Sequence, residues 1–261
     1  MNLDRMTIAV RRRTLPELYD LGLLVVRRHF ARLALLAVLG AAPWIALDAW
    51  LLRGLPGQGW TWYWLLLMAA VQAPLATAPI TAFLGEAMFE PQPSARRALI
   101  ASFSRWWWLL VLGLWYGLLA LIPFALVLAP PHAVAVLLLE DQRGRAAWSR
   151  AGALRAAWTG SWTVHLLLAA GLVVAALWLG IGTLEAFGQL LGSARVMPDP
   201  DELMPELDPS RSWLPAAALF ATLAYLAVVH FLAYLDLRTD REGWDVDLAL
   251  RRAASRQERA A

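Results

Sequence analysis

Histidine is the residue type in this sequence best suited to proton transfer or metal binding, and the chain has His29, His132, His165 and His230. No two of them stand in the HExxH or HxxxH spacing that places two imidazoles on one helix face around a zinc ion. His165 and His230 fall in apolar stretches and could meet inside a helical bundle, where an ionisable group is a functional candidate. Both also stand within a turn or two of an expected helix end, so interface packing explains them more simply.

Carboxylates gather in residues 192–212, GSARVMPDPDELMPELDPSRS, which hold five acids and four prolines. Clustered oxygen ligands suit a hard divalent cation. The segment lacks an EF-hand pattern, however, and its prolines indicate a solvated external loop. Asp245 and Asp247 form a DxD pair, a spacing too common to predict a sugar-nucleotide site.

The remaining motifs of common enzymes are missing. The sequence has no GxSxG, P-loop or GxGxxG motif. It also has no cysteine, which excludes disulfides, thiolate metal sites and a cysteine nucleophile. We therefore expect a protein that is not an enzyme, with no catalytic, cofactor-binding or metal-binding residues.

Composition places the chain in a membrane. It is 60% hydrophobic and 16% charged, with fifteen tryptophans, whereas soluble domains average about 45–50% apolar and about 25% charged residues. All twenty-three basic residues are arginine, which indicates a GC-rich genome. The net charge is only +3, and the arginines flank apolar stretches, so they predict contacts with lipid headgroups and no binding of nucleic acid.

The hydropathy pattern predicts a single all-α domain, a polytopic membrane helical bundle with about six transmembrane helices. Thr14, Pro16 and Glu17 form a helix-start signature, and residues 14–30 read as an amphipathic interfacial helix. We expect Asp48, near the end of the first span, to reach the interface, and Pro74 and Pro79 to kink or break the second. The expected spans are residues 33–52, 60–83, 105–122, 124–139, 162–191 and 213–235, followed by a cytoplasmic tail over 236–261.

Residues 104–139 are the most constrained stretch, because no charge occurs between Arg105 and Glu140 and arginine-rich segments lie on both sides. Such flanks stay cytoplasmic, so the block must enter the membrane and return. A hairpin of two short spans turning near Ile122 and Pro123 satisfies this. The alternative is a re-entrant loop that breaks at Pro130 and Pro131, which is allowed only where protein or water covers its backbone.

The distribution of arginine supports an even number of spans. With six spans and both termini inside, twenty of the twenty-three arginines are cytoplasmic, and only Arg53, Arg195 and Arg211 are not. A basic amphipathic helix precedes each of three expected hairpins, which suggests a weak threefold repeat.

The basic surface helices and the end of the last span are the candidate sites. Arginine and tryptophan on a helix parallel to the membrane bind anionic headgroups. Asp236 could also pair with one of these arginines and lock the sixth span to them. The candidate structural or lipid-interface residues are Arg143, Arg145, Trp148, Arg150, Arg155, Trp158, Asp236, Arg238, Glu242, Gly243 and Trp244.

Two stretches carry a family resemblance, LLLEDQRGRAAWSRAGALRAAW at 137–158 and FLAYLDLRTDREGWDVDLAL at 231–250. Together they resemble bacterial multi-pass proteins related to the glycerophosphoryl diester phosphodiesterase membrane domain. The matching positions are Glu140, Gly144, Ser149 and Arg150 in the first stretch, and Tyr234, Asp236, Arg238, Arg241, Glu242, Gly243, Trp244 and Asp245 in the second. The resemblance implies a six-span bundle without catalysis in a bacterial inner membrane. This chain has no phosphodiesterase domain, so that activity is not transferred.

Two functions remain open. The first is a non-enzymatic scaffold or accessory subunit of the bacterial inner membrane, with cytoplasmic termini, that contacts anionic lipid and a membrane or envelope protein through its basic-aromatic helices. The second is a transporter or lipid-handling protein, whose cavity would be lined by the spans that Pro74, Pro79, Pro123, Pro130 and Pro131 interrupt. A polar cavity at membrane depth would favour transport, and a packed apolar bundle would favour the scaffold.

Overall fold

The computed structural model describes residues 14–190, except 54, 56–57, 91, 123–124, 141 and 143, and residues 207–242. Within these residues the secondary structure is helical and no strand occurs, which confirms the all-α class. The elements are α1 (Leu15–Arg28), α2 (Phe30–Leu51), α3 (Gln58–Ala87), α4 (Ala95–Ser104), α5 (Trp106–Ala120), the 3₁₀ turn η2 (Ala125–Leu128), α6 (Ala133–Leu139), α7 (Gly144–Leu190) and α9 (Leu214–Glu242).

Three described helices are long and apolar enough to cross a bilayer: Phe30–Leu51, Trp60–Ala87 and Leu214–Thr239. A fourth candidate is the pair α4 and α5, which bends by 71° between Ser104 and Trp106. The apolar part of α7, Leu167–Thr183, is shorter. The count of six spans is therefore not confirmed, although large apolar side chains such as Val38, Leu114 and Leu167 face outward, as lipid contact would require.

The two ends of the uncharged block lie close together in the bundle. The guanidinium of Arg105, at the start of α5, donates to the carbonyl oxygen of Leu137 near the end of α6. The returning arm is not the helix expected over residues 124–139, because it consists of η2 and the seven-residue α6. A seven-residue helix is about 10 Å long, one third of a hydrocarbon core. The helical geometry is lost between Leu128 and Ala133, at Pro130 and Pro131.

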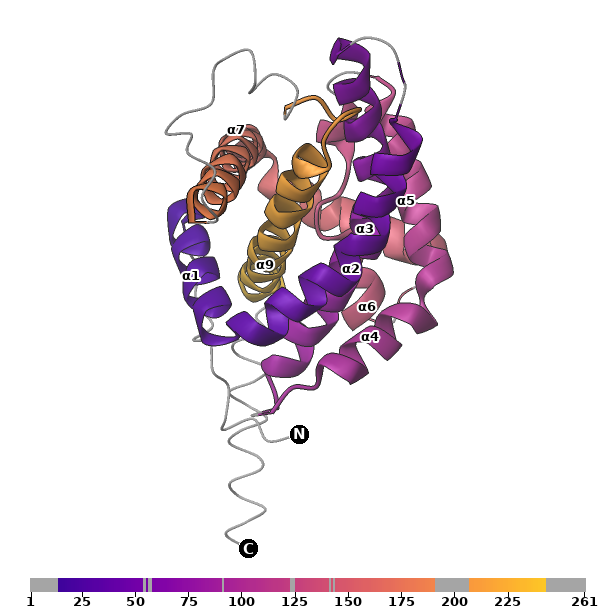
Figure 1. The fold of residues 1–261 in the computed structure, drawn as a ribbon. Helices are drawn as coiled ribbons and strands as arrows, with labels where there is room; N and C mark the ends of the chain where they lie inside the picture. Colours follow the sequence, from indigo (N-terminus) through magenta and orange to yellow (C-terminus); the bar gives the residue numbers. More distant parts are fainter. Residues whose placement is uncertain are drawn as a thin grey trace, which may run out of the picture.

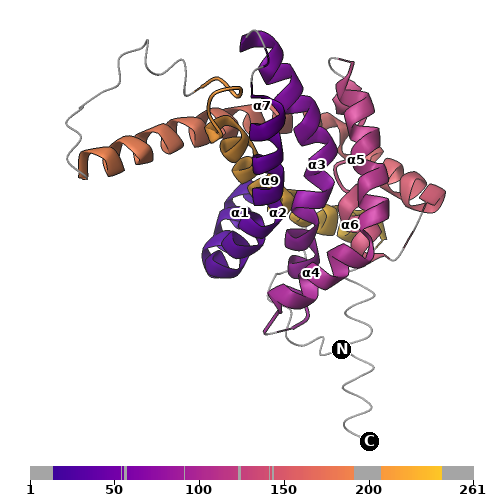
Figure 2. The same ribbon diagram turned by 45° about the vertical axis from the view of Figure 1, so that its right-hand side comes forward.

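Helix α3 lies between α2 and α5 and contacts both of them (Figures 1 and 2). Glycines allow both neighbours to approach its backbone. A Cβ added to Gly40 of α2 would lie 2.4 Å from the carbonyl oxygen of Ala76, and one added to Gly113 of α5 would lie 2.0 Å from that of Val71. Pro74 and Pro79 do not break α3, which runs continuously from Gln58 to Ala87.

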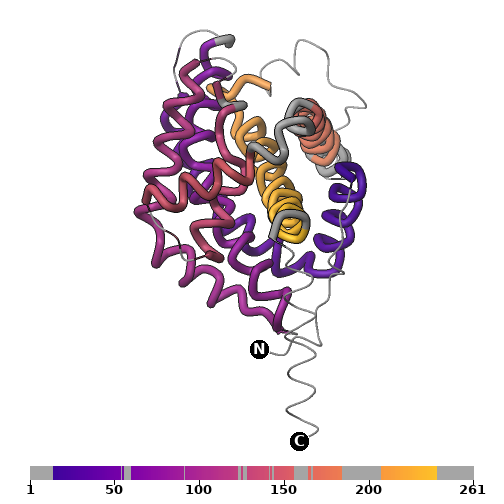
Figure 3. The backbone as a smooth tube through the Cα atoms, turned by 180° about the vertical axis from the view of Figure 1, so that it is seen from behind, coloured from indigo at the N-terminus to yellow at the C-terminus, as the bar shows by residue number. Residues whose placement is uncertain are grey.

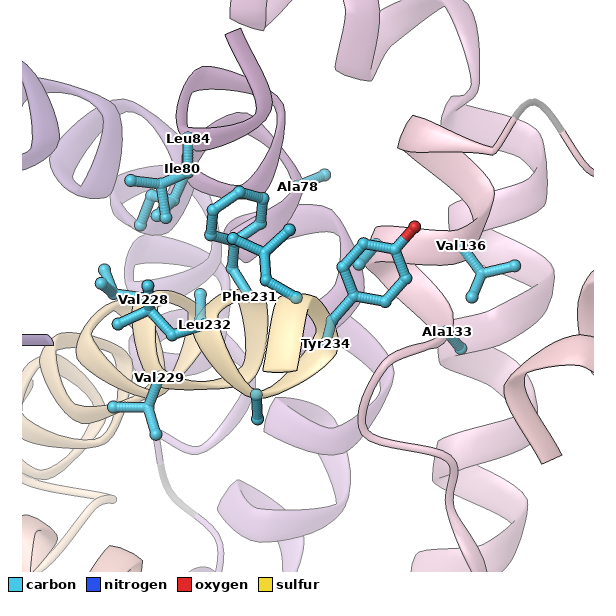
Figure 4. Close-up of a cluster of buried hydrophobic side chains, with 14 of the residues drawn as sticks. Ala78, Ile80, Leu84, Ala133, Val136, Val228, Val229, Phe231, Leu232 and Tyr234 are labelled. Carbon is cyan, nitrogen blue, oxygen red and sulfur yellow. The ribbon is translucent and has the colours of Figure 1, made fainter. Parts of the chain in front are cut away.

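Helix α9 lies between α1 and the α3–α5 pair, as Figure 1 and the reverse view in Figure 3 both show. Its side chains build the main apolar core. Figure 4 shows Phe231 facing Ile80 and Leu84 of α3, and Tyr234 pointing toward α6. The apolar stripe of α1 is directed to α9, since Leu18, Gly22 and Val25 are buried and Gly22 faces Val229.

Helix α7 is one continuous helix over Gly144–Leu190, although a surface helix followed by a separate span was expected there. Its 47 residues correspond to about 70 Å at about 1.5 Å per residue. Figure 2 shows it crossing the molecule behind the other helices, from the side of α5 and α6 to the opposite side.

Asp48, which was expected to extend toward the membrane interface, points into the protein instead. Its side chain is fully buried between α2 and α3. Gln72 Nε2 donates a hydrogen bond of 2.7 Å to Asp48 Oδ1. A buried carboxyl group in an apolar bundle is stabilised by such a partner more effectively than by a partial route to water.

Candidate functional site

The two stretches that carry the family resemblance meet around Glu140, directly after α6. Arg150 of α7 binds this carboxylate with two nitrogens, Nε at 2.9 Å from Oε2 and a terminal nitrogen at 3.4 Å from Oε1. The Glu140 side chain is only 9% exposed and that of Arg150 26%. A two-pronged, largely buried pair of this kind fixes the orientation of both side chains. Glu140 and Arg150 therefore join the end of α6 to the first turns of α7.

Helix α9 reaches the same carboxylate through Tyr234. The Tyr234 hydroxyl donates to Glu140 Oε1 at 2.8 Å, and it accepts from a terminal nitrogen of Arg238 at 3.2 Å. The Arg238 guanidinium also lies over the Tyr234 ring, 5.8 Å from its centroid. We call Glu140, Arg150, Tyr234 and Arg238 the polar clamp. It links the end of α6 and the start of α7 to α9, which is about ninety residues further along the chain.

Two predicted lipid-contact arginines turn toward protein instead. Arg150 belongs to the polar clamp, and Arg155 donates to the carbonyl oxygen of Leu128 at 2.9 Å. Arg105 makes the equivalent bond to the carbonyl oxygen of Leu137. These carbonyl groups belong to the broken return arm, so the arginines satisfy backbone acceptors that a regular helix would have satisfied itself.

The other predicted site residues are dispersed. Arg145 is exposed, and Trp148 is partly buried with its ring 5.7 Å from that of Trp115, edge to face. Asp236 is partly buried in α9, and its pairing with an arginine stays a prediction. Arg143, Gly243 and Trp244, and the side chains of Trp158 and Glu242, lie outside the described residues.

A cavity of about 330 Å³ lies between α3, α7, α9 and the segment that precedes α6. Its wall is mostly small and aliphatic and includes no arginine, aspartate or glutamate among the described residues. Pro74 and Pro131, two of the prolines considered above, are part of it. The lining residues are Leu66, Ala69, Ala70, Ala73, Pro74, Thr77, Tyr116, Ala129, Pro131, Val134, His165, Ala169, Ala170, Val173, Leu219, Thr222, Leu223, Leu226, Ala227 and His230.

Two histidines of the cavity wall form a hydrogen bond. The Nε2 atoms of His165 in α7 and His230 in α9 lie 2.8 Å apart. His165 Nδ1 lies 2.8 Å from the hydroxyl of Tyr19 in α1, so one hydrogen-bonded chain links three helices. Burial, with a smaller contribution from nearby Tyr225, raises the pKa of Tyr19, so its hydroxyl stays neutral at physiological pH.

A third histidine stands beside this chain. His132 donates from Nδ1 to the backbone carbonyl of His230 at 3.3 Å, and the two rings meet edge to face at 6.4 Å. No group of three or more metal-binding side chains is found in the part of the chain that the structure describes. His165 and His230 thus connect α7 and α9 as well as lining the cavity, and His132 contacts α9 beside them.

The hydroxyl groups of the wall are also committed to protein partners. Thr77 donates to the carbonyl oxygen of Ala73 at 2.7 Å, and Thr222 to that of Ala218 at 2.9 Å. Tyr116 donates to the carbonyl oxygen of Pro130. Each hydroxyl oxygen keeps lone pairs that can accept a further hydrogen bond.

Sequence reasoning considered a meeting of His165 and His230 but preferred interface packing. It gave a cavity along the proline-interrupted spans as one alternative, but it did not identify the residues of α7 and α9 that line it. The signal available for the cavity was the spacing of small residues on one face of α3, where Ala69, Ala73 and Thr77 recur every four residues. The polar clamp lay in the stretches singled out by resemblance, but nothing in either stretch showed that Glu140 and Tyr234 would touch.

The fold defines a helical protein with several apolar helices suited to a membrane. Comparisons with family models, with curated proteins and with solved structures found no match.

Proposed function

We propose that this protein is a multi-pass membrane protein that binds a lipid-like molecule in the cavity between α3, α7 and α9, and that it handles this lipid without chemical conversion. The observation that carries the proposal is the cavity's size and wall. Its volume of about 330 Å³ is about twice that of an engineered apolar cavity of about 150 Å³ that binds benzene. It also falls within the range of about 300–1,000 Å³ typical of small-molecule sites.

The position of the cavity favours a ligand that comes from the bilayer. On α3 the wall spans Leu66 to Thr77, and on α9 it spans Leu219 to His230. Both stretches lie in the interior of candidate membrane spans rather than at their ends. A predominantly apolar wall at that depth offers favourable contact to hydrocarbon and little to a water-soluble solute.

The small residues of the wall keep this space open. Seven alanines face it from α3, α7, α9 and residue 129, where larger aliphatic side chains would fill it. A filled core would give a more stable bundle, since interiors are otherwise close-packed. The geometry thus supports binding better than it supports a purely structural bundle.

A scaffold role is the second candidate, and exposed basic residues favour it. Arg27 and Arg28 at the end of α1, Arg96 on α4 and Arg145 on α7 are all exposed. Each basic residue near an anionic leaflet contributes about 1 kcal/mol to binding. In this role the exposed arginines would lie at the cytoplasmic side of a bacterial inner membrane, with both termini on that side, and would contact anionic lipid and a partner protein. This role is compatible with lipid binding.

Labelling with a photoreactive lipid tests the proposal. Purified protein in nanodiscs would be irradiated with a diazirine-bearing long-chain alcohol. We expect Ala169→Phe, which places a ring in the cavity, to reduce labelling several-fold. Ala175→Phe on the exposed side of the same helix is the matched control and should label like the wild type. Equal labelling of both variants and the wild type would exclude the cavity as the binding site.

A further inference from the structure

The polar atoms around the cavity restrict the chemistry of the molecule it can hold. Among its described lining residues no arginine, lysine, aspartate or glutamate occurs. An anionic headgroup brought to this wall would lose its hydration without gaining a counter-charge, which is costly at membrane depth.

Three arginines that contact the return arm or the polar clamp already have partners in the protein. Arg155 donates to the carbonyl oxygen of Leu128, Arg105 to that of Leu137, and Arg150 to the carboxylate of Glu140. Moving any of them toward a ligand would break a contact that holds the return arm or the polar clamp. A carboxylate or phosphate in the cavity could therefore pair with one of these arginines only by displacing its protein partner.

The wall offers acceptors rather than cations. The hydroxyl groups of Thr77, Thr222 and Tyr116 donate to backbone carbonyls. Their oxygens retain lone pairs that can accept a hydrogen bond. The imidazoles of His165 and His230 add a hydrogen-bonded pair in which one ring donates and the other accepts. A ligand hydroxyl can donate to such oxygens and needs no counter-ion.

We propose that the cavity takes a neutral lipid with a hydroxyl group, a long-chain alcohol in chemical class, in preference to an anionic lipid. This inference rests on the proposed function, because it names the ligand of the same cavity. At about 30 Å³ for each water-sized group, the volume of about 330 Å³ accommodates roughly ten such groups, enough for part of one chain and its hydroxyl.

The test is competition against the photoreactive alcohol by dodecanol, dodecane and dodecanoate at neutral pH. Dodecanol should protect the protein about tenfold better than dodecanoate, which corresponds to about 1.4 kcal/mol. Farnesol, added to the series, separates an isoprenoid from a saturated chain, and protection by either alcohol supports the proposal. Protection by dodecanoate equal to or better than that by the alcohols would overturn it.

Hydroxyl recognition is tested with valine variants, which keep side-chain shape. Thr77→Val combined with Thr222→Val should remove most of the preference for dodecanol over dodecane. Thr183→Val is the matched control, since Thr183 makes a similar bond to the carbonyl oxygen of Gly180 on the exposed side of α7. If dodecane protected the wild type as well as dodecanol does, hydroxyl selectivity would be excluded while lipid binding stood. Labelling that Ala169→Phe left unchanged would exclude the binding site itself, and with it both proposals.

Discussion

His165 and His230 lie with their Nε2 atoms 2.8 Å apart, although 65 residues separate them in the chain. At that distance one Nε2 must carry a hydrogen and the other must be a bare nitrogen, so the contact holds the two rings in a defined donor–acceptor relation. Tyr19 extends it to α1 at 2.8 Å. Three helices that could each pack on apolar surface alone are thereby fixed in one arrangement around the cavity.

Removal of the Tyr19 hydroxyl should loosen this arrangement. Tyr19→Phe leaves the buried Nδ1 of His165 without its bond to that hydroxyl, which we expect to lower the free energy of unfolding by about 1–3 kcal/mol. Thermal unfolding in detergent measures the change. Tyr63→Phe is the control, because its bond to the carbonyl oxygen of Leu121 is long, at 3.4 Å, and exposed. If both variants lost similar amounts of unfolding free energy, the hydrogen bond between Tyr19 and His165 would contribute no more to stability than an exposed one.

The polar clamp should behave as one coupled unit. Tyr234→Phe removes one donor from the carboxylate of Glu140, and Glu140→Gln removes the charge that Arg150 binds. We expect each to destabilise the protein, Glu140→Gln more strongly because it leaves a largely buried guanidinium without its anion. In a double-mutant cycle the interaction energy should reach about 0.5–3 kcal/mol. Strict additivity of the two substitutions would mean that Tyr234 and Glu140 do not depend on each other.

Close contact between α3 and α5 should make Gly113 intolerant of any side chain. A Cβ at this position would meet the backbone carbonyl of Val71 at 2.0 Å, so Gly113→Ala forces the helices apart. We expect a loss of several kcal/mol, well beyond the about 1 kcal/mol that alanine gains from helix propensity. Gly182→Ala has open space around it and should be neutral or stabilising. A neutral result for Gly113→Ala in thermal unfolding would contradict this helix contact.

Acid should destabilise the protein through Asp208, which joins the segment before α9 to the start of α3. Burial acts to raise the pKa of this carboxyl group, but hydrogen bonds from Ser210 and Thr61 and the charge of Arg211 outweigh it and lower the pKa. A lowered pKa in the folded state stabilises the protein above the unfolded value of about 3.9, and this stabilisation is lost as pH falls through the folded value. Asp208→Asn should flatten the acid limb of a plot of unfolding temperature against pH, and Ser210→Ala should do so partly. An unchanged acid limb in Asp208→Asn would assign acid sensitivity to other groups.

Local signals in the sequence predicted those features that depend on the residues of a single segment. The capping box of Thr14 and Glu17 starts α1, and its backbone-to-carboxylate bond is 2.9 Å long. The arginine flanks predicted that residues 104–139 enter and return, because topology depends on charge at both ends of a stretch. The contact of Arg105 with Leu137 brings the two ends of this stretch together, and the membrane topology of the stretch stays a prediction.

Other features depend on contacts that no single segment reveals. Apolar composition over residues 124–139 cannot distinguish a spanning helix from a broken arm whose backbone carbonyls are satisfied by Arg105 and Arg155. Likewise, no proline separates the basic and apolar halves of α7. The helix therefore continues through residue 161, where a boundary between two helices was expected. The cavity arises only when small residues of α3, α7 and α9 face one another.

The position of a photochemical adduct tests the central claim most directly. Wild-type protein in nanodiscs would be labelled with the diazirine-bearing alcohol, digested and mapped by mass spectrometry. Lipid binding in the cavity predicts adducts concentrated on its wall, in the stretches around Ala169 of α7 and Leu223 of α9, and their loss in Ala169→Phe but not in Ala175→Phe. Adducts confined to outward-facing residues such as Val38 and Leu179, unchanged in both variants, would contradict it.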